Sequence, residues 1–164
     1  MNNIKQVLFI TLLAGLGYWG WQAVFPPPEK QIRSALQKLA ETTSFTSAEK
    51  PLRRLGAINA IPTFFTTNAV VRVHGGGYSR SLEGKNEIRE AAAGSRAGAQ
   101  SLKVKFTDPN ITVHNKNQAE VAVTATVYLD GDPNPQLQIL KMTLQRSQRK
   151  WLIHRVDPVD WALK

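Results

Sequence analysis

Histidines and paired carboxylates are the side chains of this chain that could support metal binding or proton transfer. Its three histidines fall near the middle or end of different predicted strands and lack the short spacing of metal ligands: His74, His114 and His154. Asp157 and Asp160 form a carboxylate pair, but beside Pro158 they are typical of a capped turn. The sequence therefore predicts no metal, no cofactor and no catalytic pair.

A glycine-rich run follows the first of these histidines. His74-Gly75-Gly76-Gly77 matches the sequence that builds an oxyanion hole in lipase-like hydrolases. Such a hole works together with a nucleophilic serine in a G-x-S-x-G elbow, and the chain contains no such elbow. We therefore interpret the run as a turn whose glycines permit positive φ angles.

An apolar, uncharged segment over residues 7–24 precedes all of these residues and is followed by three prolines. At about 1.5 Å per helical residue, it is long enough to cross most of a bilayer core. The aromatic side chains at its C-terminal end suit a membrane–water interface: Tyr18, Trp19 and Trp21. The sequence predicts an N-terminal cytoplasmic stub and transmembrane anchor over residues 1–28, followed by one domain over residues 29–164.

A cleaved secretory signal is the alternative for this segment. It fits less well, because Trp21 occupies a position where a small residue is wanted if cleavage follows Ala23. The positive-inside rule would keep the domain in the cytoplasm, since only Lys5 precedes the segment while several cations follow it. Long domains translocate largely regardless of charge, so we expect a single-pass membrane protein with its domain outside the cytoplasm.

Composition limits the chemistry of the domain. The chain has no cysteine, which excludes disulfides, thiol nucleophiles and thiolate metal sites. Residues 29–164 contain 20 of the 21 Lys and Arg residues and all 12 Asp and Glu residues, an excess of eight positive charges. This excess favours an anionic partner, such as lipid headgroups or an acidic protein face. Nucleic acid is not favoured, because the basic stretch over residues 146–150 contains no stacking ring.

Hydrophobic spacing predicts two helices, a strand hairpin, a third helix and then four strands. Helices are expected around these residues: 32–39, 51–61 and 85–96. Strands are expected over these residues: 64–73, 79–82, 102–106, 121–129, 140–144 and 151–156. The order predicts an α+β domain in which a long antiparallel meander is covered on one face by three helices.

Strict alternation along the last strand predicts which side chains share a face. It places Trp151, Ile153 and Arg155 on one face, and Leu152, His154 and Val156 on the other. If a ligand pocket exists, the expected wall residues are Val73, Met142, His154 and Arg155. Core packing explains the apolar members of this set equally well.

Three stretches resemble the nuclear transport factor 2-like superfamily, which includes the SnoaL-like and ketosteroid isomerase-like proteins. Residues 64–71 (FFTTNAVV) are similar to its aromatic run into the first strand, and residues 82–89 (LEGKNEIR) to its glycine and isoleucine helix start. Residues 150–153 (KWLI) are similar to its last strand. The resemblance implies a conical α+β fold of a curved, mostly antiparallel sheet packed by about three helices, often in homodimers that pair through the sheet.

The same resemblance indicates where a catalytic base would lie in this sequence. In isomerase-like members, a carboxylate near the end of the first strand acts as the general base. That position falls on Val73, which cannot transfer protons, and the adjacent His74 is expected to point to the opposite face. The resemblance therefore implies the fold without implying the isomerase reaction.

We expect a membrane-tethered, non-enzymatic interaction or assembly module of the cell envelope. The predicted anchor, the complete domain and the missing base motivate this hypothesis. A small-molecule-binding protein or SnoaL-like enzyme that uses the cone cavity is the first alternative, and an accessory subunit of a larger membrane complex is the second. Membrane-tethered relatives exist in the superfamily, and the expected partners are the bilayer and either a second copy of the chain or a membrane-complex protein.

Overall fold

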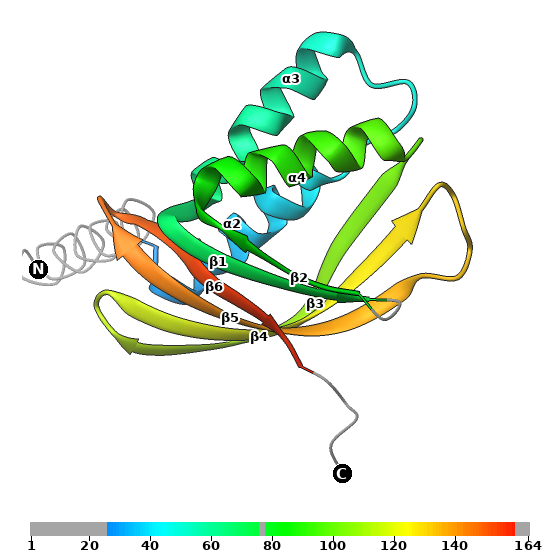
Figure 1. The fold of residues 1–164 in the computed structure, drawn as a ribbon. Helices are drawn as coiled ribbons and strands as arrows, with labels where there is room; N and C mark the ends of the chain where they lie inside the picture. The colour runs from blue at the N-terminus through cyan, green and yellow to red at the C-terminus, as the bar shows by residue number, and fades with distance from the viewer. Residues whose placement is uncertain (1–25, 76–77, 160–164) are drawn as a thin grey trace, which may run out of the picture.

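A computed structural model describes residues 26–75 and 78–159, which form a curved sheet with helices on one side (Figure 1). The helices are α2 (Pro28–Thr43), α3 (Pro51–Ala60), the 3-10 helix η1 (Ile61–Phe64) and α4 (Gly84–Gly98). The strands are β1 (Phe65–Gly75), β2 (Tyr78–Glu83), β3 (Leu102–Asn115), β4 (Gln118–Leu129), β5 (Gln136–Ser147) and β6 (Lys150–Pro158). Every helix and strand predicted within the domain is present, and the α+β class is confirmed.

The strands form one six-stranded sheet in the order β2-β1-β6-β5-β4-β3. Neighbouring strands are antiparallel except β1 and β6, which pair in parallel. The last strand therefore lies in the middle of the sheet, between the β1–β2 hairpin and the β3–β5 meander. This pairing makes a single sheet from two segments that are far apart in the sequence.

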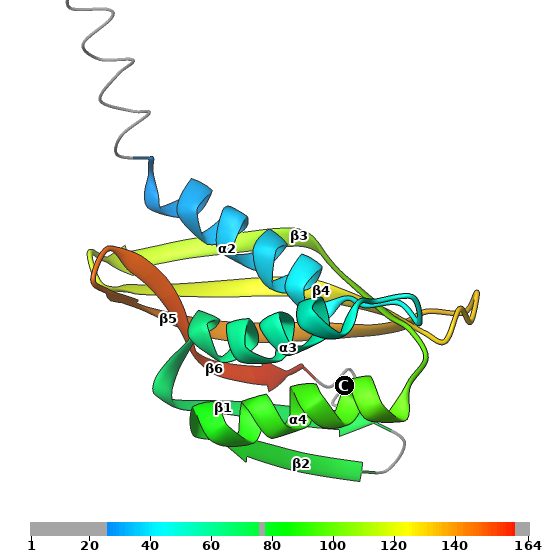
Figure 2. The same ribbon diagram turned by 90° about the horizontal axis from the view of Figure 1, so that it is seen from above.

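Two helices cover the sheet and bury the apolar stripes that the sequence pattern predicts. Figure 2 shows α2 along β3, and α4 over β1 and β2. Their inward side chains, including Ile32, Leu36 and Ile88, join one core with side chains from the sheet. The largest fully buried side chains are Ile32, Met142, Leu144, Val121 and Val123. These side chains form the core between the helices and the sheet.

Helix α3 differs from the other two helices because it buries none of its residues. In Figure 1 it stands above α4, on the side away from the sheet. Leu52 and Leu55 remain 85% and 59% exposed. The helical spacing of these leucines correctly predicts a helix, but it does not predict burial.

A register shift in β6 corrects the predicted faces of the last strand. Val156 pairs with Met142 and Ile153 pairs with Leu144, with one extra residue between them on β6. Because of such a bulge, two side chains separated by an odd number of residues along the strand point to the same face of the sheet. Trp151, Ile153 and Val156 are consequently buried together, whereas Arg155 is exposed. The predicted grouping of Arg155 with Trp151 and Ile153 is therefore wrong.

The predicted membrane anchor lies outside the described residues, as do its aromatic residues Tyr18, Trp19 and Trp21. Among the residues that the structure describes, no helix is long and apolar enough to span a bilayer. The glycine-rich run is described only in part, with Gly75 pairing with Tyr78 across the β1–β2 hairpin.

Candidate functional site

The main hollow of the described chain is an open groove of about 1700 Å³ between α2 and β3. One wall is formed by residues of α2 and of the connection that follows it, and the other wall is the first half of β3. The start of α3 closes one end, and the β4–β5 turn contributes Gly131 to Pro133. We call this hollow the α2–β3 groove.

Basic side chains dominate the walls of the groove. Five cations line it: Arg33, Lys50, Arg53, Lys103 and Lys105. None of the five makes an ion pair with any described residue. Three carboxylates also line it, and Glu49 is paired with Arg96 at 3.5 Å. The other two, Glu41 and Asp132, form no ion pair with any described residue and offset part of the positive charge. The groove therefore presents an excess of uncompensated positive charge.

The interior of the groove is apolar. Leu36, Ala40 and Phe45 line it and belong to the buried residues, while Val104 and Phe106 are half-buried. On the β3 wall, the Nζ of Lys105 lies 6.0 Å from the centre of the Tyr128 ring. Apolar surface beneath cationic side chains suits a ligand that has both apolar groups and negative charge.

The connection between α2 and α3 is fixed against the outer edge of β3. Phe45 and Leu102 exchange backbone hydrogen bonds with N–O distances of 2.8 and 3.0 Å. The Val104 amide donates to the Ser44 hydroxyl at 2.9 Å. These contacts satisfy edge groups of β3 that would otherwise be free to pair with another strand. They also hold the two walls of the groove together.

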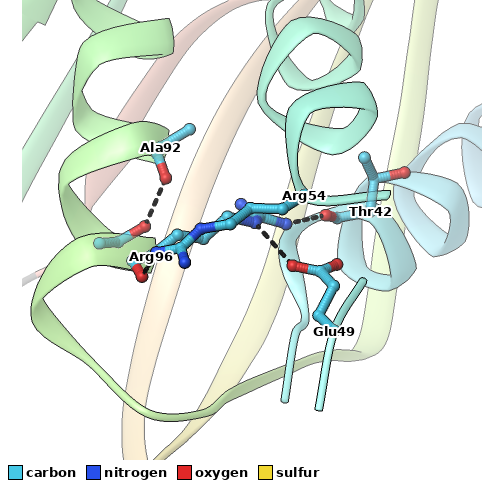
Figure 3. Close-up of polar contacts among 6 residues, drawn as sticks. Thr42, Glu49, Arg54, Ala92 and Arg96 are labelled. Atoms are coloured by element: carbon cyan, nitrogen blue, oxygen red, sulfur yellow. Dashed lines mark hydrogen bonds and ion pairs between the residues drawn. The ribbon is translucent and has the colours of Figure 1, made fainter. Parts of the chain in front are cut away.

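The side chain of Arg96, in α4, contacts the connection between α2 and α3 (Figure 3). This side chain is almost wholly buried; its Nη2 donates to the Thr42 carbonyl at 2.7 Å, and its Nε lies 3.5 Å from Glu49 Oε2. Its guanidinium also lies 4.9 Å from the centre of the Phe45 ring. Arg54 of α3 donates a hydrogen bond to the Arg96 carbonyl, so α2, α3 and α4 meet at one residue.

Burial has an electrostatic consequence for this arginine. Desolvation lowers the pKa of Arg96 below its ordinary value, while the Glu49 carboxylate opposes that shift. Its Nη1 has no hydrogen-bond partner among the described residues. Because an unpaired buried cation is costly, Glu49 is required beside it. The contact is structural, since Arg96 itself does not line the groove.

The four predicted pocket residues lie in different surroundings in the described chain. Met142 is part of the packed core, and Val73 is 49% exposed. His154 is half-buried, with its Nδ1 3.1 Å from Thr66 Oγ1, and Arg155 is exposed with its Nε 4.0 Å from Asp157 Oδ2. None of the four lines the α2–β3 groove or the smaller hollow at the β4–β5 turn, and their role as pocket walls stays a prediction.

Two further titratable candidates from the sequence, His114 and Asp157, lie in surface ion pairs. Asp157 accepts a hydrogen bond from Arg72 at 2.8 Å. Glu120 lies 3.3 Å from Lys141 and 3.7 Å from His114. No group of three metal-ligating side chains occurs within residues 26–75 and 78–159. Asp160 lies outside that part of the chain.

Comparison with known proteins identifies the fold. No protein-family model matches the chain, and no curated protein matches it. A Nostoc punctiforme protein of unknown function with a cystatin-like fold is similar at TM-score 0.62 and 14% identity, over 82% of this chain and 92% of that chain. A Novosphingobium aromaticivorans protein, described as nuclear transport factor 2-like with a cystatin-like fold, gives TM-score 0.62 and 14% identity over 92% and 88%.

Other similar structures have enzyme descriptions. A Streptomyces avermitilis protein, described as a proposed dehydratase of the nuclear transport factor 2-like family, gives TM-score 0.59 and 18% identity over 80% of this chain and 96% of that chain. A proposed aromatic ring hydroxylase from Novosphingobium aromaticivorans gives TM-score 0.61 and 19% identity over 84% and 93%. At these identities the likeness establishes the fold, and the described chain has the nuclear transport factor 2-like fold.

Proposed function

We propose that this protein is a non-enzymatic interaction module, tethered to a membrane by its N-terminal segment, that captures an anionic partner in the α2–β3 groove. The observation that carries the proposal is the set of five cations that form no ion pair with any described residue and that surround an apolar interior. The packed core beneath the helices and the absence of a proton-transfer group at Val73 support binding rather than catalysis.

Charge reversal on one wall tests the groove. The intact protein in lipid nanodiscs would be titrated with a fluorescent 12-residue peptide of alternating Glu and Ser. Lys103→Glu with Lys105→Glu should weaken binding by about tenfold or more, because two attractions become repulsions. Lys116→Glu with Lys150→Glu is the matched control, since both lysines are exposed and lie outside the groove. Equal losses in the two variants would show that only net charge matters and would contradict the proposal.

The tether is tested separately by cell fractionation and by a topology reporter fused after Lys164. We expect the intact chain in the membrane fraction, with the reporter active outside the cytoplasm. The predicted apolar segment over residues 7–24 supports this expectation. Recovery of a soluble mature chain that lacks this segment would contradict the tether without affecting the groove. Comigration with other proteins on a native gel would identify an accessory subunit of a membrane complex.

A second candidate function is small-molecule binding or SnoaL-like catalysis. The similar structures described as a proposed dehydratase and a proposed hydroxylase favour it. Native mass spectrometry of gently purified protein would show a retained metabolite if this function holds. The interaction module would be the better explanation if the protein shows the mass of the chain without a ligand, and if the variant with Lys103→Glu and Lys105→Glu unfolds at the same temperature as the wild-type protein.

A further inference from the structure

The first half of β3 is an edge of the sheet that the described chain pairs only in part. Leu102 exchanges backbone hydrogen bonds with Phe45, and the Val104 amide donates to a serine hydroxyl, so both residues direct main-chain groups away from β4. Because β3 pairs with β4 without a register shift over residues 102–107, the same alternation directs the N–H and C=O of Phe106 to this edge. Among the described residues, none outside the sheet forms a backbone hydrogen bond with these two groups.

The α2–β3 groove follows this edge. Residues 102–107 of β3 all line it, and at about 3.3 Å per residue they extend over about 20 Å. Beyond them, Asp108 has a positive φ of 50°, Pro109 has no N–H, and the register with β4 shifts, which ends the regular edge. The groove therefore contains a short strip of extended backbone, which suits an elongated ligand better than a compact anion.

The two faces of this strip differ in their chemistry. Lys103 and Lys105 are exposed on one face, together with the ring of Tyr128, which pairs with Lys103. Val104 and Phe106 are half-buried on the other face, where Phe106 packs against the core to which α2 contributes. A strand laid along the edge has the same alternation, because successive side chains point to opposite faces of a sheet. Its side chains would therefore meet the lysines and the apolar face in turn.

We infer that the occupant of the groove is an extended polypeptide segment that adds to the β3 edge and that carries carboxylates alternating with apolar side chains. The inference rests on the proposed function of the groove and names its partner. Main-chain hydrogen bonds to Phe106 set the register of such a segment, while Lys103 and Lys105 attract its carboxylates. A lipid fits less well, because an acyl chain has no N–H or C=O groups to pair with a strand edge.

The periodicity of a peptide tests this mode of binding. The intact chain in phosphatidylcholine nanodiscs would be titrated with two 12-residue peptides of equal composition, one alternating Glu and Val and the other repeating Glu-Glu-Val-Val. We expect the alternating peptide to bind about tenfold more tightly, because only its carboxylates all fall on the lysine face of an added strand.

Main-chain pairing is tested by N-methylation of the alternating peptide, which removes N–H donors without changing its charge. One version carries the methyl groups on every Val and the other on every Glu. Only alternate N–H groups of an added strand face β3, so one version should lose about fivefold or more in affinity while the other stays within about twofold of the parent. Equal affinities of the two versions would overturn pairing with the edge.

Single charge reversals on the two edge strands locate the bound peptide. Lys105→Glu on β3 should weaken binding of the alternating peptide by about fivefold or more, because an attraction becomes a repulsion. Arg80→Glu is the matched control, since Arg80 is exposed on β2, the other edge strand, and lies outside the groove. It should change the affinity by less than about twofold, because distant exposed charges are screened. Thermal unfolding verifies that both variants are folded.

The outcomes separate the inference from the groove proposal. Equal binding of the alternating and Glu-Glu-Val-Val peptides, with both weakened by Lys105→Glu, overturns the inference and leaves the groove proposal intact. Equal losses in Lys105→Glu and Arg80→Glu contradict both statements. Failure of both peptides to bind the wild-type chain overturns the groove proposal itself. Binding of phosphatidylglycerol vesicles that is lost in Lys105→Glu, without a preference between the two peptides, identifies a lipid surface and overturns the polypeptide occupant.

Discussion

Arg96 connects three segments that are far apart in the chain. Its side chain contacts the end of α2 at Thr42 and the following connection at Phe45 and Glu49, while its carbonyl accepts a hydrogen bond from α3. A buried cation of this kind stabilises only when its partners are present, because its hydration has been lost. The shape of the groove wall therefore depends on a residue that lies behind it.

Removal of the Arg96 cation should destabilise the domain. Arg96→Met leaves the Glu49 carboxylate nearly buried without its cation, and we expect a loss of about 3 kcal/mol in the free energy of unfolding. Urea denaturation provides the measurement. Arg89→Met, at an exposed position of the same helix, should change the unfolding free energy by less than about 0.5 kcal/mol. Similar values for the two variants would refute the structural role of Arg96.

The residue scale is where prediction from the sequence is weakest. Nothing in the helix around Arg96 indicates that this arginine is buried, because its partners come from another part of the chain. The exchange of Arg155 and Val156 between faces follows from one extra residue in β6. A bulge changes every face assignment beyond it, yet periodicity alone does not locate it.

The sequence predicts the helices and strands well because the residues that mark each of them lie close together in the chain. Prolines and apolar spacing mark α2 and α3, and alternation marks β3 to β6. The burial of α3 could not be predicted in the same way, since helical spacing reports a shared face and not what covers it. The sheet is already covered by α2 and α4, which leaves α3 outside.

The difference between α2 and α3 predicts different costs for the same substitution. Leu36→Ala should lower the free energy of unfolding by about 2 to 5 kcal/mol, because it opens a cavity in the core. Leu52→Ala should change it by less than about 0.5 kcal/mol, because that side chain is exposed. Chemical denaturation of both variants provides the comparison. A large loss for Leu52→Ala would mean that α3 packs against the domain in solution.

Two glycines should respond in opposite ways to alanine. Gly84 begins α4 at φ +75°, and a Cβ there would lie 3.2 Å from the Thr67 carbonyl oxygen, so Gly84→Ala should destabilise by about 1 kcal/mol or more. Gly56 lies inside α3 with nothing within 4 Å of an added Cβ. Gly56→Ala should therefore stabilise by up to about 1 kcal/mol. Thermal unfolding curves would reveal whether the signs differ.

At the scale of the whole molecule, the groove depends on distant segments meeting in space. The charge excess predicts an anionic partner, but it does not indicate where the charges gather. Residues 33–53 and 101–109 form the two principal walls, and only the folded sheet brings them together. The family resemblance implies a ligand site inside the cone of sheet and helices. The larger of the two described hollows lies instead at the edge of the sheet, between α2 and β3.

Salt should weaken capture of an anionic partner in the α2–β3 groove. Raising the salt concentration from about 0.05 to 0.5 M should weaken binding of the Glu-Ser peptide by about tenfold, because exposed charges are screened. Isothermal titration at several salt concentrations measures this affinity. A salt-independent Glu-Ser affinity would refute electrostatic capture.

The central place of β6 also bears on the order in which the molecule can assemble. This strand joins the β1–β2 hairpin to the β3–β5 meander, yet it is the last described strand in the sequence. In a nascent polypeptide that ends at residue 149, the strand that pairs with both halves of the sheet is missing. Completion of the fold must wait for the ribosome to deliver residues 150–158. In a chain exported from its N-terminus, that delay would keep the domain unfolded, and so able to pass through a translocation channel, until export is well under way.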